Sequence, residues 1–270
     1  MIELTGVTKT YPDGTVAVDD FSAQFPPHKT TVLLGSSGSG KTTILRMVNR
    51  MVDASAGTIT IDGEDIAGRD PVKLRRSIGY VMQNGGLLPH RSVLDNIATV
   101  PLLNGVGKAA AHSRARDLMD LVGLDEKLAR RFPAQLSGGQ QQRVGVARGL
   151  AADPNILLMD EPFGAVDPLV RAELQDELLR IQHTLAKTIV FVTHAVDEAL
   201  RLGDQIILLA DGGHVAQRGT GPDLLGAPAS AFVADFLGLD RGSRALFDRD
   251  GVLVDAFGRA AGVLTQDAPA

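Results

Sequence analysis

The feature that most constrains the fold is the stretch Gly35-Ser36-Ser37-Gly38-Ser39-Gly40-Lys41-Thr42. It follows an apolar run, Thr31 to Leu34, and precedes Thr43 to Val48, which has helical periodicity. A strand, a loop of small residues and a helix in this order are the context of a phosphate-binding P-loop. Small residues let successive backbone N–H groups face phosphate oxygens, and the helix N-terminus adds roughly half a positive charge. The sequence therefore predicts an α/β fold that binds a nucleoside triphosphate.

Two side chains of this stretch have expected roles of their own. We expect Lys41 to reach the β- and γ-phosphates and the Thr42 hydroxyl to be a ligand of Mg²⁺. A flexible Ser/Gly linker is the alternative, but linkers lack the Lys-Thr ending and the flanking strand and helix. The predicted nucleotide-binding residues here are Gly35, Ser36, Ser37, Gly38, Ser39, Gly40, Lys41, Thr42 and Thr43.

Composition limits the class of protein. The chain of 270 residues is 44% apolar and 22% charged, as soluble globular proteins are. Its net charge of −5 and the absence of a long basic run argue against nucleic acid as a principal partner. It has no cysteine and no apolar run long enough to cross a bilayer, so we expect any membrane span to come from other subunits.

The residues before the P-loop predict antiparallel strands. Ile2 to Val7 alternates apolar and polar residues, a turn begins at Tyr11, and a second strand covers about Val16 to Phe25. Tyr11 either stacks on an adenine ring or is an ordinary turn aromatic.

The residues after the P-loop predict a strand and then a helical insertion. Ile78 to Met82 reads as a buried strand with Gln83 at its carboxyl end, where ligands of α/β sheets gather. From Asn84 to about Arg131 the pattern is helical, most clearly over Ala109 to Val122.

A second glycine-rich helix start follows at Leu136-Ser137-Gly138-Gly139-Gln140. Glycines at a helix N-terminus allow an anionic ligand to approach the backbone closely. A plain glycine-rich cap is the alternative. We predict that Ser137, Gly138, Gly139 and Gln140 contact the nucleotide.

Two further buried strands end in polar side chains. The apolar run Ile156 to Met159 is followed by Asp160 and Glu161, and we expect this strand to lie beside the P-loop strand in the sheet. Asp160 suits the Mg²⁺ shell, and Glu161 is placed to orient or deprotonate a water; an exposed acidic pair is the alternative. His194 follows Thr188 to Thr193 and either hydrogen-bonds a γ-phosphate or has a structural role.

The remaining pattern predicts three elements: a strand over Gln205 to Ala210, a hairpin into His214 to Gln217 and a helix over Pro228 to Leu237. Beyond Asp240 the pattern is lost, apart from a strand at Val252 to Val254.

In this order, the motifs over Met1 to Leu239 closely resemble the ATP-binding subunit of an ABC transporter. The resemblance implies a P-loop ATPase domain over 1–239, with a mainly parallel core sheet, an N-terminal antiparallel β subdomain and a helical subdomain at about 84–135. It also implies ATP and Mg²⁺ as ligands and ATP hydrolysis as the activity. Glu161 and His194 are the implied catalytic residues, Thr42, Gln83 and Asp160 the implied metal site, and Tyr11, Gln83 and Asp167 further nucleotide contacts.

The same resemblance implies an assembly. Two subunits pack head to tail, so that Ser137 and Gly139 of one contact the γ-phosphate held by Lys41 of the other. This homodimer works at the cytoplasmic face of the membrane, beneath two transmembrane permease subunits, and an extracytoplasmic binding protein delivers the solute.

A finer resemblance concerns the transported solute. The stretches Gln83 to His90, Asn96 to Pro101 and Phe232 to Arg241 resemble the ATPases of quaternary-amine importers, which carry glycine betaine, choline or carnitine. Fuller members carry a paired CBS module after this point, and the 240–270 tail is too short for one. An importer ATPase for another polar solute such as an amino acid, and a non-transport ABC ATPase, remain open alternatives.

Overall fold

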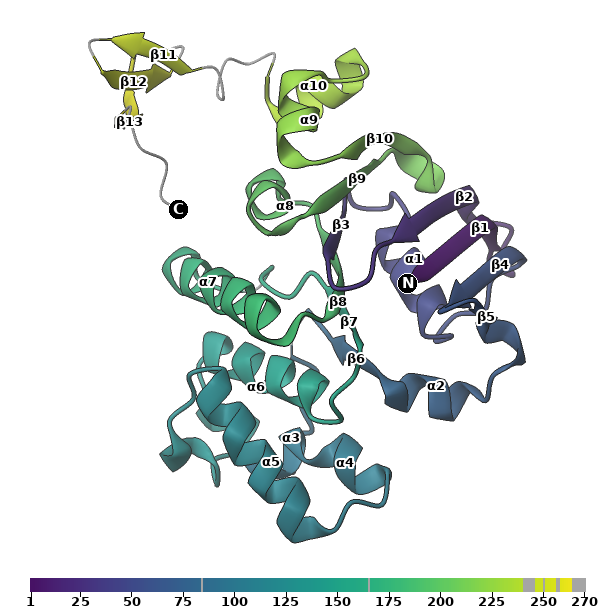
Figure 1. The fold of residues 1–270 in the computed structure, drawn as a ribbon, viewed down its shortest axis with the longest axis vertical. Helices are drawn as coiled ribbons and strands as arrows, with labels where there is room; N and C mark the ends of the chain where they lie inside the picture. The colour runs from purple at the N-terminus through teal and green to yellow at the C-terminus, as the bar shows by residue number, and fades with distance from the viewer. Residues whose placement is uncertain (84, 165, 240–245, 250, 256–257, 264–270) are drawn as a thin grey trace.

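The computed structural model describes residues 1–83, 85–164, 166–239, 246–249, 251–255 and 258–263 (Figure 1). Its N-terminal part is a four-stranded antiparallel sheet in the order β2-β1-β4-β5. Ile2 at the start of β1 pairs with Phe25 of β2 on one side and with Ile61 of β4 on the other. The two predicted antiparallel strands are confirmed as β1 (Ile2–Thr10) and β2 (Val16–Phe25), and the sheet also contains β4 (Ala56–Ile61) and β5 (Glu64–Asp65).

The second sheet has six strands in the order β10-β9-β3-β8-β7-β6. They are β3 (Thr30–Gly35), β6 (Ile78–Val81), β7 (Ile156–Asp160), β8 (Thr188–Thr193), β9 (Gln205–Leu209) and β10 (Val215–Gly219). All neighbours are parallel except β9 and β10, the predicted hairpin. The expectation that β7 adjoins the P-loop strand is wrong, because β8 lies between β7 and β3. Since the strands are parallel, the ends of β3, β6, β7 and β8 meet at one edge.

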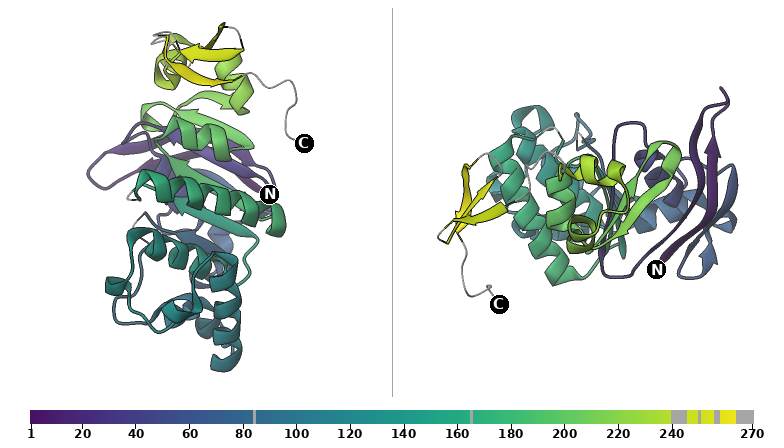
Figure 2. Two further views of the ribbon diagram at one scale, coloured as in Figure 1. Left: turned by 90° about the vertical axis from the view of Figure 1, so that its left-hand side faces the viewer. Right: turned by 90° about the horizontal axis from the view of Figure 1, so that it is seen from above.

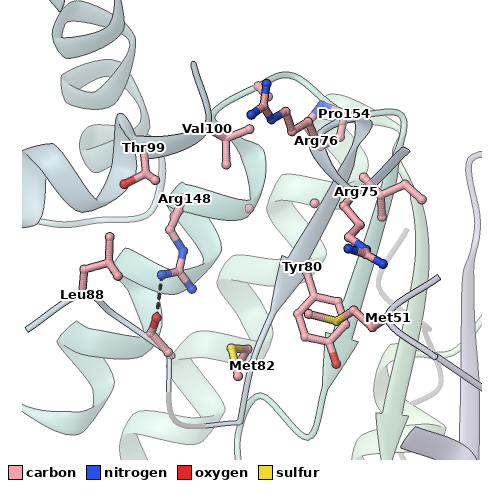
Figure 3. A pocket seen from close by; sticks show the side chains of 15 residues that line it. Met51, Arg75, Arg76, Tyr80, Met82, Leu88, Thr99, Val100, Arg148 and Pro154 are labelled. Carbon is pink, nitrogen blue, oxygen red and sulfur yellow. Dashed lines mark hydrogen bonds between the residues drawn. The ribbon is translucent and has the colours of Figure 1, made fainter. Parts of the chain in front are cut away.

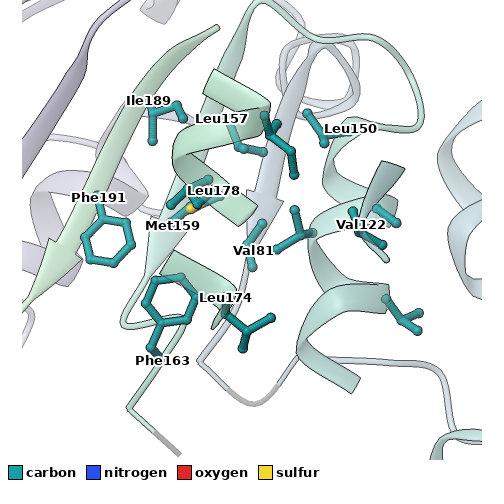
Figure 4. Close-up of a cluster of buried hydrophobic side chains, with 14 of the residues drawn as sticks. Val81, Val122, Leu150, Leu157, Met159, Phe163, Leu174, Leu178, Ile189 and Phe191 are labelled. Carbon is teal, nitrogen blue, oxygen red and sulfur yellow. The ribbon is translucent and has the colours of Figure 1, made fainter. Parts of the chain in front are cut away.

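Helices cover both faces of this sheet, which explains its nearly continuous apolar strands. In β8, Ile189 and Phe191 pack into one core with α6, α7 and α8, drawn in Figure 4. Val190 and Val192 pack on the opposite face with α1 and the antiparallel sheet. Seen from above in Figure 2, the purple N-terminal strands and the teal and green helices lie on opposite sides. The helices are α1 (Lys41–Val48), α6 (Gly138–Leu150), α7 (Pro168–Leu185) and α8 (Val196–Leu202).

Between β6 and β7 the described residues contain helices and no strand, which agrees with the predicted helical insertion. The amphipathic α5 buries Ala111, Ala115, Leu118 and Met119. Asn84, the expected start of this region, lies outside the described residues. The helices before α6 are α3 (Val93–Ile97), α4 (Thr99–Leu103) and α5 (Lys108–Leu121), and α3 and α5 contact α6. Helix α2 (Pro71–Ser77) lies before β6. In the described part of the chain no helix combines the length and apolar character that crossing a membrane requires.

The C-terminal part differs from the prediction in two places. Helix α9 (Gly221–Gly226) was not predicted, although Thr220 and Asp223 form a capping box at its start. Helix α10 (Ala231–Leu237) begins later than expected, because Ser230 caps it.

Beyond Asp240, the predicted strand at Val252 to Val254 is confirmed as part of β12, but the expectation that the pattern is otherwise lost is wrong for the described residues. A small antiparallel sheet is formed by β11 (Leu246–Arg249), β12 (Val252–Asp255) and β13 (Ala260–Val263). Asp248 accepts a hydrogen bond from the Gly251 N–H at the first hairpin turn. The four-residue strands β11 and β13 give too few alternating positions to be recognised from periodicity.

Candidate active site

The P-loop joins β3 to α1 and leaves the helix N-terminus without a side-chain cap. Gly40 is the N-cap residue in the left-handed conformation, with φ +89°. A Cβ atom at this position would lie 2.6 Å from the Ala17 carbonyl oxygen, so only glycine fits. Because no side chain accepts from the first turn, its N–H groups remain available to an anion.

The Lys41 side chain is buried against this loop. Its ammonium donates to the Gly35 carbonyl at 2.9 Å, to Ser39 Oγ at 3.2 Å and to the Ser36 carbonyl. Burial lowers the pKa of Lys41, while the charges of Glu161 and Asp160 oppose this shift. These loop oxygens are neutral acceptors, so an anion at the helix N-terminus would be a stronger partner for this cation. The loop therefore fits a phosphate group.

Asp160 lies at the end of β7, opposite Thr42 of α1. Its side chain is mostly buried, and Oδ1 accepts a hydrogen bond from Thr42 Oγ1 at 2.7 Å. Oδ2 accepts from the Tyr80 hydroxyl at 3.0 Å and from Arg46 at 3.5 Å. Burial, followed by the charge of Asp160, raises the pKa of Tyr80 to about 12, so the phenol stays protonated and donates.

The paired Thr42 hydroxyl and Asp160 carboxylate are the donor set that Mg²⁺ uses in nucleotide sites. There the ion takes one or two protein ligands and completes its shell with phosphates and water. No cluster of three His, Cys, Asp or Glu side chains able to hold a metal occurs among the residues whose placement is described. The residues thus fit a metal ion whose remaining ligands come from a bound substrate.

The two predicted catalytic side chains contact one another. His194 Nδ1 lies 3.1 Å from Glu161 Oε2. Glu161 has φ +44°, a left-handed conformation that is costly for a residue with a side chain, and its N–H donates to the Val192 carbonyl at 3.0 Å. Such strain persists where the surrounding structure enforces it, often at functional sites.

Gln83 belongs to the same edge. A Cβ atom on Gly164 would lie 3.2 Å from Gln83 Nε2 and 3.7 Å from Glu161 Oε2, so the amide and the carboxylate flank one glycine. The structure therefore brings the ends of β6, β7 and β8 together beside the P-loop.

Tyr11 lies next to the first turn of α1. Its hydroxyl is 3.5 Å from Thr43 Oγ1, and the Lys9 ammonium is 5.3 Å from its ring centroid. This position is compatible with the predicted stacking on a base.

The glycine-rich start of α6 is not brought to the P-loop within one chain. Ser137 Oγ accepts from the Gln140 N–H at 3.3 Å, and Gln140 Oε1 accepts from the Ser137 N–H at 3.0 Å. Gly139 is buried, and a Cβ atom there would meet Val170 at 2.5 Å. Among the described residues no hydrogen bond joins 137–140 to 35–42, and α1 and α6 cover opposite faces of the six-stranded sheet. Asp167, before α7, accepts through its carbonyl from the Arg171 N–H at 2.8 Å.

Sequence reasoning missed Tyr80 and Arg46. Arg46 is four residues after Thr42, on the same face of α1, so helical spacing is a signal that could have placed it near Asp160. Tyr80 had no such signal, since its contact with Asp160 depends on the pairing of β6 with β7.

A cavity of about 310 Å³ opens beside β6 (Figure 3). Its lining is mainly apolar, with basic side chains from α2 and α6. Arg148 closes one side by donating to the Gly85 and Gly86 carbonyls, each at 2.7 Å. The lining residues are Met51, Arg75, Arg76, Ile78, Gly79, Tyr80, Met82, Gly86, Leu88, Thr99, Val100, Arg148, Gly149, Ala152 and Pro154.

Comparison with known proteins identifies the class. The sequence pattern of the family described as ABC transporter matches residues 18–164. A solved structure described as a dimeric post-hydrolysis state of the ATP-binding cassette MJ0796, bound to ADP and Pi, aligns with a TM-score of 0.75. It is 32% identical and covers 82% of this chain and 98% of that one. The chain belongs to the ABC transporter family.

Two characterised relatives are more similar in sequence. The glycine betaine uptake system ATP-binding protein of Escherichia coli (strain K12) is 50% identical, over 88% of this chain and 77% of the relative. The carnitine transport ATP-binding protein of Listeria monocytogenes is 47% identical over 89% of this chain. The chain spans 60% of the length of this second relative.

Proposed function

We propose that this chain is the ATP-hydrolysing, energy-coupling subunit of an importer for quaternary-amine osmoprotectants such as glycine betaine or choline. The observation that carries the ATPase assignment is the cluster at one sheet edge: a P-loop with Lys41, the Thr42–Asp160 pair and the Glu161–His194 pair. The solute class is proposed from the names of the two transport relatives.

The roles of the residues follow from their contacts. Lys41 and the first turn of α1 bind the β- and γ-phosphates of the substrate ATP. Thr42 and Asp160 hold Mg²⁺, with Gln83 beside them; the ion, when bound, neutralises charge on the phosphates. Glu161 orients and deprotonates the attacking water, and His194 fixes the Glu161 carboxylate and the γ-phosphate. Tyr11 stacks on the adenine.

The complete site forms between two copies of the chain. The start of α6 is a helix N-terminus with glycines, yet it lies apart from the P-loop of its own chain. In a head-to-tail homodimer, Ser137, Gly138, Gly139 and Gln140 of one copy contact ATP held by the other, and Asp167 lies at the subunit boundary. The solved cassette at 32% identity, which is described as dimeric, supports a dimer. ATP then binds between two helix N-termini and favours association.

The dimer works beneath two permease subunits at the cytoplasmic face of the membrane, with an extracytoplasmic binding protein that delivers the solute. We assign the permease contact to the cavity beside β6. Its apolar lining and basic rim, including Arg75 and Arg76, suit an amphipathic segment with acidic side chains. The helices over 84–135 and the core 1–239 act as one ATPase domain with a movable helical part.

Solute uptake tests the proposal directly. Cells that lack other osmolyte importers express this chain with its transporter subunits, and uptake of labelled glycine betaine and choline is measured. We expect ATP-dependent uptake that the Glu161→Gln variant abolishes, because loss of a general base costs about 10²- to 10⁴-fold. The exposed Glu64→Gln variant is the matched control.

The outcomes separate the two parts of the proposal. If the purified protein hydrolyses ATP but no quaternary amine enters, the solute assignment is wrong and the ATPase assignment stands. Normal hydrolysis by the Glu161→Gln variant contradicts the catalytic assignment.

A further inference from the structure

Tyr80 contacts two regions that the proposed function treats separately. Its ring lines the cavity beside β6, together with Met82 and Val100, as Figure 3 shows. Its hydroxyl donates to Asp160 Oδ2 at 3.0 Å. Because β6 and β7 pair in parallel with Tyr80 opposite Leu158, the side chain lies on the same face of the sheet as Asp160. One side chain thus spans from the cavity to the candidate metal ligand.

The orientation of the Asp160 carboxylate depends on this contact. Thr42 holds Oδ1 at 2.7 Å, whereas Oδ2 is held by Tyr80 at 3.0 Å and more distantly by Arg46 at 3.5 Å. The carboxylate is mostly buried, so protein donors rather than bulk water decide which lone pairs face a cation. Partners behind a metal ligand orient it and tune the affinity for the metal.

On its cavity side, the Tyr80 ring borders open space rather than close-packed core. Side chains in a close-packed interior have little freedom, but a ring at a cavity wall can change its position when the cavity is filled. A displacement there moves the hydroxyl at the other end of the same rigid ring. Gln83, by contrast, is exposed and does not line this cavity.

We propose that Tyr80 is a positioning residue that transmits the filling of the cavity beside β6 to Asp160, and so to Mg²⁺ binding with the nucleotide. This inference rests on the proposed function, which assigns the cavity to the permease and the Thr42–Asp160 pair to the metal. Coupling between two sites is reciprocal, so Mg²⁺-ATP in turn changes the affinity of the cavity for its occupant.

The first test removes only the hydroxyl. Tyr80→Phe keeps the ring in the cavity wall and deletes the donor to Asp160. We expect the Mg²⁺ concentration for half-maximal effect on trinitrophenyl-ATP fluorescence to rise roughly tenfold. Binding of the same nucleotide in EDTA stays unchanged, which a general loss of folding would not allow. An unchanged Mg²⁺ dependence overturns the positioning role.

The second test fills the cavity. The chain has no cysteine, so Val100→Cys introduces a single thiol at the cavity wall, and N-phenylmaleimide adds an apolar ring there. We expect labelling to shift the half-maximal Mg²⁺ concentration by about fivefold or more, and this shift to vanish when Tyr80→Phe is also present. Labelled Leu225→Cys, on α9, is the matched control and shows no shift.

The outcomes distinguish this inference from the proposed function. If the unmodified protein binds no trinitrophenyl-ATP with Mg²⁺, the proposed function itself fails. If it binds the nucleotide and labelling shifts the Mg²⁺ dependence equally with Tyr80 or Phe at this position, coupling does not pass through the hydroxyl and the inference is wrong.

Discussion

The N-termini of α1 and α6 look alike in sequence and differ in structure. Helix α1 follows a loop of small residues and glycines, and α6 begins with two glycines after Ser137; both compositions favour an anion at a helix start. At α1 the N-cap is Gly40 and no side chain caps the helix. At α6 the capping box of Ser137 and Gln140 satisfies N–H groups within the chain. The first end is left open for a ligand, and the second is capped by its own side chains.

Their surroundings differ as well. Near the start of α1, Thr42 donates to Asp160 at 2.7 Å, and Lys41 and Glu161 line one pocket. The start of α6 packs against Val170 of α7 and has exposed Ser137 and Gly138. The two ends thus differ in what they offer a ligand: the start of α1 has charged side chains and an uncapped turn, and the start of α6 has glycines and an exposed serine. This asymmetry is the reason for proposing a composite site between two chains.

The largest expected effect is at α1. Lys41→Ala removes the only ammonium hydrogen-bonded to the loop oxygens among the described residues, and a charge-assisted hydrogen bond contributes about 1.5–3 kcal/mol. We expect ATP affinity of the isolated subunit to fall roughly 10- to 150-fold, measured by isothermal titration calorimetry. Lys127→Ala, at a side chain that is 90% exposed, is the control. An unchanged ATP affinity in the Lys41→Ala variant would falsify the assignment of the α1 N-terminus as the open, phosphate-binding helix end.

A mixture of two inactive variants tests whether the ends meet across subunits. Lys41→Ala disables the P-loop, and Ser137→Arg places a bulky side chain at the start of α6. In a heterodimer of the two, one site combines Lys41 of one copy with Ser137 of the other. Since half of randomly formed dimers are mixed and hold one of two sites, we expect about a quarter of normal ATPase activity in a 1:1 mixture. A site within one chain predicts no gain over the separate variants.

Much of the fold was predictable because its signals are local. Buried parallel strands read as apolar runs, and the P-loop marks the turn from β3 into α1. The order of the strands in the sheet, by contrast, depends on contacts between residues that are far apart in the sequence. The sequence suggested that β7 adjoins β3, whereas β8 lies between them, and this order is what places His194 beside Glu161.

The missed features show the same limit. The contact of Tyr80 with Asp160 joins residues 80 positions apart through strand pairing, and no spacing rule encodes it. The strands β11 and β13, which pair with the predicted strand β12, were missed for the opposite reason. These strands are so short that an alternation of apolar and polar residues is hardly visible in the sequence. They are defined instead by hydrogen bonding to a neighbouring strand.

The smallest expected effect separates capping from ligand binding at α6. Ser137→Ala removes a cap, which costs about 1 kcal/mol of stability. Ser92→Ala is the matched control, because Ser92 caps α3 in the same way, accepting from the Asp95 N–H at 3.1 Å. We expect both variants to lower the unfolding free energy similarly in urea titrations. Only Ser137→Ala should weaken the ATP-dependent dimer of a Glu161→Gln background, by about fivefold in sedimentation, since in the proposed dimer its hydroxyl also contacts the nucleotide of the other copy. Equal dimer dissociation constants for the two variants would mean that Ser137 only caps α6 and does not contact the nucleotide. Any contact of the α6 N-terminus with ATP would then have to come from Gly138 and Gly139.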